Sequence, residues 1–225
     1  MKKSIFYSII CTGIVFFMST ICFSQGKADT TKVKSDKALT ATQVKAKFDE
    51  LKASKNENAT KKMSQSMEGK GFKAENGYFG NESTIEKEGV TLTNTIYIQD
   101  YKKGTTTGAL GIISISDGKN VETYTFSLEK TGNNLNDVTE HFVNEKLEIV
   151  KANSWYSCLY KALQARCGVT AGLKLLNSCW TAYASASWSS FLNCIKGAWC
   201  GVTSLACCTC DCSWWCKYAA GCCDR

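Results

Sequence analysis

Cysteine and tryptophan are concentrated at the C-terminal end of this chain, and this distribution restricts the possible folds more than any other feature. Twelve of the fourteen Cys and all six Trp lie in the last 75 residues, whereas residues 26–150 contain neither type. The two remaining cysteines, Cys11 and Cys22, lie in an apolar N-terminal stretch. A break this sharp predicts two modules, one stabilised by an ordinary core and the other by cross-links.

The N-terminus has the layout of a cleaved secretory signal. Two lysines precede an almost wholly apolar stretch over residues 4–23, and small Ser24 then leads into Gln25 and a polar run. We therefore predict a signal peptide over residues 1–24, cleavage near Ser24/Gln25 and a secreted protein.

Two other interpretations of this segment remain open. A membrane anchor is the first, because about 20 apolar residues are long enough to span a bilayer. A lipoprotein anchored at Cys22 is the second, but bulky Ile21 directly before that cysteine matches a lipoprotein signal poorly.

Export determines how the C-terminal cysteines are interpreted. Outside the cytosol paired cysteines form disulfides by default, and twelve, an even number, remain after cleavage. The cysteines predicted to form disulfides are Cys158, Cys167, Cys179, Cys194, Cys200, Cys207, Cys208, Cys210, Cys212, Cys216, Cys222 and Cys223.

A thiolate metal site is the alternative, because the cysteines between Cys207 and Cys212 alternate in a way that suits zinc or copper(I). Export, the lack of His near these cysteines and the many bulky Trp residues favour disulfides instead. His141 is the only His in the chain and is interpreted as a partly exposed strand residue, so no base activates a cysteine nucleophile. We expect no catalytic residue, no metal site and no cofactor, and therefore not an enzyme.

The region between the signal and the cysteines predicts an α+β domain. Residues 25–39 are polar and charged without periodicity, which indicates a flexible lead-in. Residues 40–151 form a Cys-free region that begins with helices over 41–54 and 59–68, the first of them after a capping box that Thr40 starts.

Segments rich in β-branched and aromatic residues then predict an antiparallel meander of four to six strands. The clearest segments are 91–98 and 109–116, and Asp117-Gly118 forms a favourable hairpin turn after the second. A last hairpin is expected around Asn144-Glu145. We expect the two helices to pack on one face of this sheet.

Residues 152–225 predict a small all-α module that is stabilised by disulfides. Apolar residues recur at helical spacing over residues 155–163, and further helices are expected after Gly168, from Tyr183 and after Gly201. About 70 residues make only a marginal core, and each disulfide contributes roughly 2–4 kcal/mol by constraining the unfolded chain.

Charge separates the same two regions. Residues 26–150 hold 18 basic and 18 acidic residues, whereas residues 151–225 hold 7 basic residues and only two acidic ones. A basic, aromatic, acid-poor segment suits an anionic membrane surface, although packing inside the module is the other use for its Trp residues. The predicted membrane contacts are Trp214, Trp215, Lys217 and Tyr218. The basic residues are sparse and no nucleic-acid motif is visible, so no nucleic-acid partner is expected.

Two short stretches carry a resemblance to a known family. They are Asn153-Ser154-Trp155-Tyr156-Ser157-Cys158 and Cys216-Lys217-Tyr218-Ala219-Ala220-Gly221-Cys222. With these stretches, and with its order of signal, Cys-free region and Cys-rich peptide, the chain resembles the halocin-like family of secreted bacteriocin precursors. The resemblance implies an antimicrobial peptide at the C-terminus and a pro-region, residues 40–151, that acts as its chaperone or immunity partner.

The sequence therefore predicts a secreted antibacterial peptide precursor whose cationic, disulfide-bonded C-terminal module acts on bacterial membranes. The expected partners are an anionic bacterial membrane or another surface target, and the pro-region itself. A non-enzymatic extracellular adhesive or interaction module, which would stay attached to the rest of the chain, is the alternative. Metal sequestration by thiolates is the third hypothesis.

Overall fold

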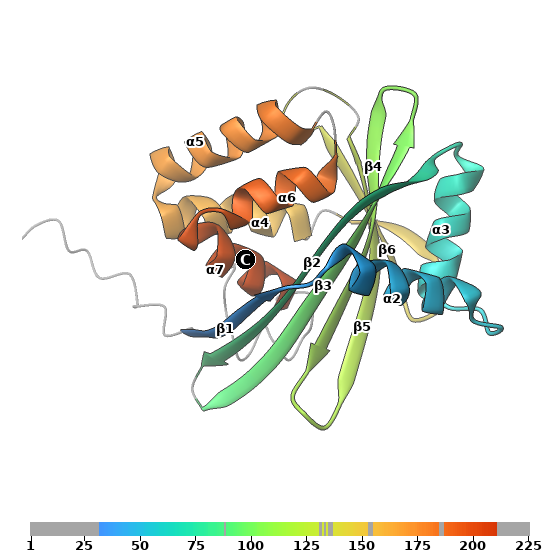
Figure 1. The fold of residues 1–225 in the computed structure, drawn as a ribbon, viewed down its shortest axis with the longest axis horizontal. Helices are drawn as coiled ribbons and strands as arrows, with labels where there is room; N and C mark the ends of the chain where they lie inside the picture. The colour runs from blue at the N-terminus through green and yellow to red at the C-terminus, as the bar shows by residue number, and fades with distance from the viewer. Residues whose placement is uncertain are drawn as a thin grey trace, which may run out of the picture. The chain divides into compact units, whose positions relative to one another are not determined.

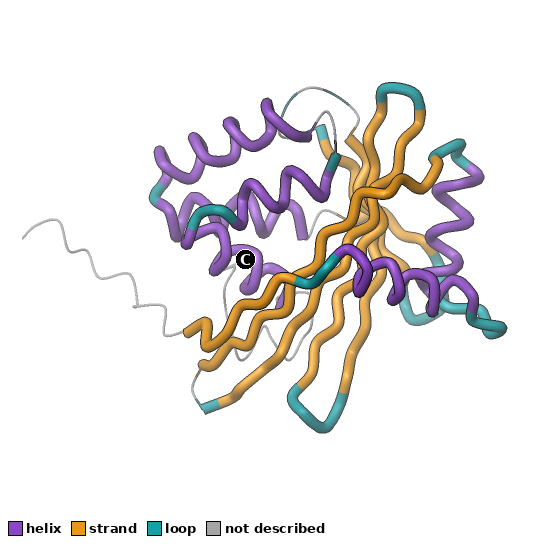
Figure 2. The backbone as a smooth tube through the Cα atoms, viewed as in Figure 1, coloured by secondary structure: helices purple, strands orange, loops and turns teal. Residues whose placement is uncertain are grey.

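A seven-stranded antiparallel sheet with helices on both faces forms the centre of the fold (Figure 1, Figure 2). The structure is a computed structural model that describes residues 32–87, 89–130, 132, 134, 137–152, 155–184 and 187–210. Strand order in the sheet equals strand order in the sequence, so the sheet is a meander, as predicted. The strands are β1 (Lys32–Ala38), β2 (Lys73–Lys87), β3 (Val90–Lys103), β4 (Thr106–Ser116), β5 (Val121–Lys130), β6 (Val138–Val143) and β7 (Ile149–Ala152).

Two helices between β1 and β2 pack on one face of the sheet, which we call the α2/α3 face. Helices α2 (Ala41–Ala53) and α3 (Ala59–Gly69) match the predicted ranges within one residue. The predicted capping box is present: the Thr40 hydroxyl accepts a hydrogen bond from the Gln43 N–H, and the Gln43 side chain accepts one from the Thr40 N–H. Local signals therefore determine where α2 begins.

Four α-helices of the C-terminal region lie on the side of the opposite face of the sheet, which we call the module face, and α5 is the outer one, packed on α4 and α6 (Figure 1). They are α4 (Trp155–Cys167), α5 (Val169–Cys179), α6 (Trp188–Lys196) and α7 (Trp199–Cys210), with a short π-helix, η1 (Trp180–Ala184), after α5. Gly168 has a φ of 82° and reverses the chain between α4 and α5. None of the helices in the part of the chain that the structure describes is long and apolar enough to cross a membrane.

Side chains of the central strands alternate between the two faces. In β3, Ile96 and Ile98 belong to the core on the module face, whereas Tyr101 belongs to the core on the α2/α3 face. In β4, Ile113 belongs to the core on the module face and Ile112 to the core on the α2/α3 face. Burial on both faces explains why β4 is an almost continuous apolar run rather than an alternating one.

Both predicted hairpin turns are present. Asp117 accepts hydrogen bonds from the N–H groups of Lys119 and Asn120, and Gly118 has a φ of 87°, a conformation that glycine adopts without strain. The second turn, at Asn144, joins β6 to β7.

Two expectations about the N-terminal half are wrong. Residues 32–38 are not part of a flexible lead-in over 25–39, because they form β1 and pair with β2 at the edge of the sheet. The sheet also has seven strands instead of four to six, because β1 and the polar strand β2 complete it. The predicted signal peptide, residues 1–24, lies outside the described residues.

The predicted boundary between residues 151 and 152 does not divide the hydrophobic core. One cluster runs from Phe126 and Leu128 of the sheet into Trp155 and Leu159 of α4. The sheet and the C-terminal helices belong to one compact unit. The α+β class and the disulfide-bonded helical region are confirmed, but that region packs on the sheet and shares its core.

Candidate functional site

Three disulfides among the described residues cross-link the C-terminal helices to one another. Their Cα–Cα distances are 5.3–5.6 Å, ordinary values for disulfides. The pairs are Cys158–Cys208 and Cys167–Cys200, which both join α4 to α7, and Cys179–Cys194, which joins α5 to α6. Disulfide bonding is therefore present for six of the twelve cysteines predicted to form it.

The remaining predicted residues lie outside what the structure describes. These are the side chains of Cys207 and Cys210, the whole of Cys212, Cys216, Cys222 and Cys223, and the membrane contacts Trp214, Trp215, Lys217 and Tyr218. Because Cys208 is bonded to Cys158, one thiolate is missing from the run considered as a metal site. The described residues contain no cluster of His, Cys, Asp and Glu that could hold a metal ion.

Three of the six tryptophans belong to the core between the sheet and the helices. The Trp155 ring lies 5.3 Å from the ring of Phe126 in β5, between centroids. Trp188 packs edge-on against Trp180 at 5.8 Å and against Phe191 at 5.8 Å. For these three tryptophans the packing interpretation is the correct one.

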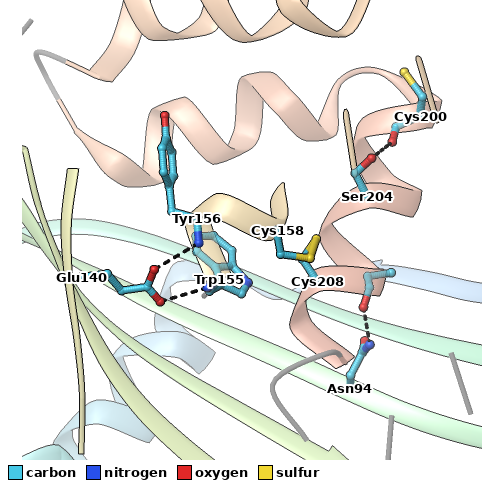
Figure 3. The surroundings of a disulfide bond; sticks show 9 residues. Asn94, Glu140, Trp155, Tyr156, Cys158, Cys200, Ser204 and Cys208 are labelled. Carbon is cyan, nitrogen blue, oxygen red and sulfur yellow. Dashed lines mark hydrogen bonds between the residues drawn. A yellow bond between two sulfur atoms is a disulfide. The ribbon is translucent and has the colours of Figure 1, made fainter. Parts of the chain in front are cut away.

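Glu140 of β6 caps the start of α4 from the sheet (Figure 3). One carboxylate oxygen accepts a hydrogen bond from the Trp155 N–H at 3.1 Å, and the other accepts one from the Tyr156 N–H at 3.2 Å. The first N–H groups of a helix lack partners within it, and negative charge is favourable there. Glu140 is only 1% exposed, so these two N–H groups compensate for the water that its carboxylate has lost.

Asp100 of β3 makes the equivalent contact at the start of α6. Its carboxylate accepts hydrogen bonds from the Ser189 N–H at 2.9 Å and from the Ser189 hydroxyl at 2.6 Å. Helix α6 also has a cap of its own, because the Ser187 hydroxyl accepts from the Ser190 N–H at 3.0 Å. Burial raises the pKa of the Asp100 carboxyl, and the hydrogen bonds from Ser189 act in the opposite direction.

Lys196 attaches the last turn of α6 to the edge of the sheet. Its ammonium group lies 3.2 Å from the Asp36 carboxylate of β1 and also donates to the Asn81 side-chain oxygen. The Asn81 amide and the Ser83 hydroxyl in turn donate to the other oxygen of the Asp36 carboxylate, at 2.6 and 3.0 Å. A cation at a helix C-terminus is also favoured by the helix dipole.

Asn94 of β3 makes a neutral hydrogen bond to α7. Its side-chain NH₂ donates to the Ala206 carbonyl at 2.7 Å, and Asn94 is only 1% exposed (Figure 3). The sheet therefore makes a buried or partly buried polar contact with each of α4, α6 and α7.

The C-terminal helices carry only basic charged residues, whereas the sheet places carboxylates at its contact with them. Residues 155–210 contain four basic and no acidic residues. The sheet contributes three carboxylates, those of Asp36, Asp100 and Glu140. Only the Asp36 carboxylate is seen to pair with a cation of these helices, Lys196. Those of Glu140 and Asp100 accept hydrogen bonds at the starts of α4 and α6, so the arrangement positions the helices on the sheet.

His141 lies on the α2/α3 face, away from the helices of the module. Its Nδ1 is 3.9 Å from the Glu129 carboxylate, which pairs at 2.6 Å with Lys70, the residue that follows α3. The side chain is 19% exposed, which agrees with a partly exposed strand residue.

Among the residues of this candidate site, the sequence did not reveal the buried acidic ones. Asp100 and Glu140 have polar neighbours in the sequence, such as Gln99 and Thr139, so the local pattern does not mark either carboxylate as buried. Their partners Ser189 and Trp155 lie 89 and 15 residues further along the chain, so no short spacing indicates them.

Comparison with known proteins gives no relative for this chain. No protein-family model, no curated protein and no solved structure matches it. The role of the contact between the sheet and the helices is therefore inferred from its own chemistry.

Proposed function

We propose that this chain is the precursor of a secreted antibacterial peptide, residues 152–225, and that the sheet covers an apolar surface of the helices in this module. The supporting observation is the distribution of covalent cross-links. Residues 26–150 contain no cysteine, and the described disulfides join only helices of the module. Once the signal is removed, the peptide segment between β7 and α4 is the one covalent link between sheet and module, so cutting it leaves a cross-linked module held by non-covalent contacts.

Separation from the sheet exposes an apolar surface of the module. Trp155 and Ala206 are 0% and 2% exposed in the intact chain, where Trp155 contacts Phe126 and Ala206 is bonded to Asn94. Insertion into a bilayer needs an apolar surface in addition to positive charge. The sheet covers this surface, so the intact precursor is expected to be less active than the free module.

An anionic bacterial membrane is the proposed target. Residues 151–225 carry a net charge of +5, from seven basic and two acidic residues. Each basic residue near an anionic surface contributes about 1 kcal/mol, so the charge is sufficient to bring the peptide to the membrane. In the intact chain Lys196 is paired with Asp36, and release makes this ammonium group available to lipid phosphates.

An intact extracellular interaction module is the second candidate function. The observation that favours it is the shared core, in which Phe126 and Trp155 belong to one cluster. A chain that works in one piece is expected to bury polar contacts between its parts, as Asp100 and Ser189 do.

The test uses the full-length oxidised protein with a protease recognition site inserted between Ala152 and Trp155. Dye release from anionic and from zwitterionic vesicles, and growth inhibition of bacteria, are measured before and after cutting. We expect the cut protein to release dye from anionic vesicles, less so at high salt, and the uncut protein to release little. Trp214→Ala combined with Trp215→Ala should weaken the cut protein.

A cut protein that releases no dye at any salt concentration and inhibits no bacterium overturns the antibacterial proposal. Activity of the uncut chain in a binding assay, together with that negative result, would favour the intact interaction module instead.

A further inference from the structure

The Cys158–Cys208 disulfide lies directly beside a contact from the sheet (Figure 3). Glu140 accepts hydrogen bonds from the N–H groups of Trp155 and Tyr156, three and two residues before Cys158. The first turn of α4, which carries Cys158, is therefore fixed on β6 by a buried carboxylate.

A second contact from the sheet lies beside the partner cysteine. Asn94 donates a hydrogen bond to the carbonyl of Ala206, two residues before Cys208. Cys158 and Cys208 are 7% and 0% exposed and belong to the same cluster as the core residues of the strands. The sheet thus holds the backbone next to each of the two sulfurs, on both sides of the bond.

Cys158 has competing partners in the sequence. Fifty residues separate it from Cys208, and Cys207 and Cys210 lie within two residues of that position. The entropy of closing a loop changes slowly with its length, so an unfolded chain hardly distinguishes these three cysteines. Selection of Cys208 therefore requires contacts that position the backbone of α4 and the backbone of α7 at the same time.

We propose that the sheet is the template that selects Cys208 as the partner of Cys158 during oxidative folding. Glu140 positions the start of α4 and Asn94 positions α7, which raises the effective concentration of one thiol near the other. This role goes beyond the proposed antibacterial function and applies equally to a chain that stays intact.

The oxidation is an exchange with a low-molecular-weight disulfide. The Cys158 thiolate attacks the donor disulfide, forms a mixed disulfide and releases one donor thiolate. The Cys208 thiolate then attacks the Cys158 sulfur of the mixed disulfide and releases the second donor thiolate. Two protein thiols lose two electrons and two protons, and one donor disulfide becomes two thiols.

The test follows the pairing of Cys158 in the full chain. The protein is reduced in denaturant, refolded in a buffer of reduced and oxidised glutathione, and trapped with an alkylating reagent at short intervals. Disulfide-linked peptides are fragmented without prior reduction, which identifies the cysteine bonded to Cys158. The wild type is compared with the double variant Asn94→Leu/Glu140→Gln, and with Asn58→Ala as the matched control.

Asn58 is a suitable control because it makes comparable contacts on the α2/α3 face. Its side chain accepts from the Lys61 N–H to cap α3 and donates to the Leu51 carbonyl. Asn58→Ala therefore lowers the stability of the sheet side without touching the module. Because pairing is scored on trapped chains, the readout exists whether or not a variant reaches its final fold.

In the wild type and in Asn58→Ala we expect Cys208 to be the main partner of Cys158 from the earliest times. In the double variant we expect its early share to fall at least threefold, with Cys207 and Cys210 taking its place. Equal pairing in the double variant and the wild type overturns the proposal. So does a loss of pairing in Asn58→Ala as large as in the double variant, because general stability would then determine the partner.

Discussion

Asp100 of β3 accepts two hydrogen bonds from a single residue of α6, Ser189, through the backbone N–H and the side-chain hydroxyl. Asp100 is 3% exposed, and burial raises the pKa of its carboxyl. A raised pKa means that the folded protein binds this proton more tightly than the unfolded chain does. The free energy of unfolding therefore falls as the pH rises from about 4, the unfolded pKa, through the raised folded value.

Asp100→Asn is expected to remove this pH dependence. The amide oxygen can still accept from the Ser189 N–H, and the amide NH₂ can donate to the Ser189 hydroxyl. Urea unfolding between pH 4 and 7 measures the effect, and the variant should gain stability relative to the wild type as the pH rises.

Asp117→Asn is the matched control and should show the opposite trend. Hydrogen bonds from the N–H groups of Asn120 and Lys119 lower the pKa of Asp117, so its contribution is lost as the pH falls. This variant should therefore lose stability relative to the wild type as the pH rises. Parallel curves for Asp100→Asn and the wild type would contradict the first expectation.

Glu140→Gln should lower the free energy of unfolding by about 1–3 kcal/mol, because one helix N–H then faces an NH₂ group in place of an oxygen. Urea unfolding of the oxidised protein gives this value. Glu145→Gln, at an exposed position in the turn between β6 and β7, is the control and should change stability by less than about 0.5 kcal/mol. Equal stabilities of the two variants would show that the Glu140 contact with Trp155 contributes nothing.

Gly172→Ala should disrupt the close approach of α4 and α5. A Cβ at this position would overlap the backbone carbonyl of Leu163, which cannot move without shifting α4. We expect a loss of about 1–3 kcal/mol and a lower Tm by calorimetry. Gly69→Ala, in α3 with no atom near its new Cβ, should be neutral or raise stability by up to about 1 kcal/mol. A Tm of Gly172→Ala equal to that of the wild type would count against this packing.

The pKa of His141 is lowered, first by burial and then by the charge of Lys70, while Glu129 acts in the opposite direction. The folded protein therefore binds the proton less tightly than the unfolded chain does. The resulting stability is complete above about pH 6.5 and is lost as the pH falls from there through the lowered folded pKa.

Lys70→Met should raise the pKa of His141, because it removes a nearby positive charge and leaves Glu129 without that partner. Titration by NMR measures this directly, since the chain contains one histidine. Lys119→Met, in the exposed hairpin turn, should leave the pKa unchanged. A pKa that falls or stays constant in Lys70→Met would refute this account of the site.

Elements whose signals are local could be predicted from the sequence. The capping box at Thr40 and the turn at Asp117-Gly118 act within four residues, so both are visible in the sequence. β1 was missed because it depends on pairing with β2; Val33 packs against the core, while lysines occupy much of the strand. Its stability comes from another strand and not from its own pattern.

The contact between the sheet and the module could not be predicted from the sequence, for a different reason. A charged side chain in a strand is usually exposed, and only the partner shows that Asp100 is buried. That partner, Ser189, is 89 residues away. The alternation within β4 is hidden in the same way, because Ile112 and Ile113 are both buried, each under a different layer of helices.

Because the sheet is a meander, every strand after β1 pairs with a strand that the ribosome has already made. The last strand ends at Ala152, and α4 begins at Trp155. Proteins are synthesised from the N-terminus and tend to fold in that order. The strands that receive the helices are thus all translated before the first of these helices, so the sheet can form before α4 packs on it.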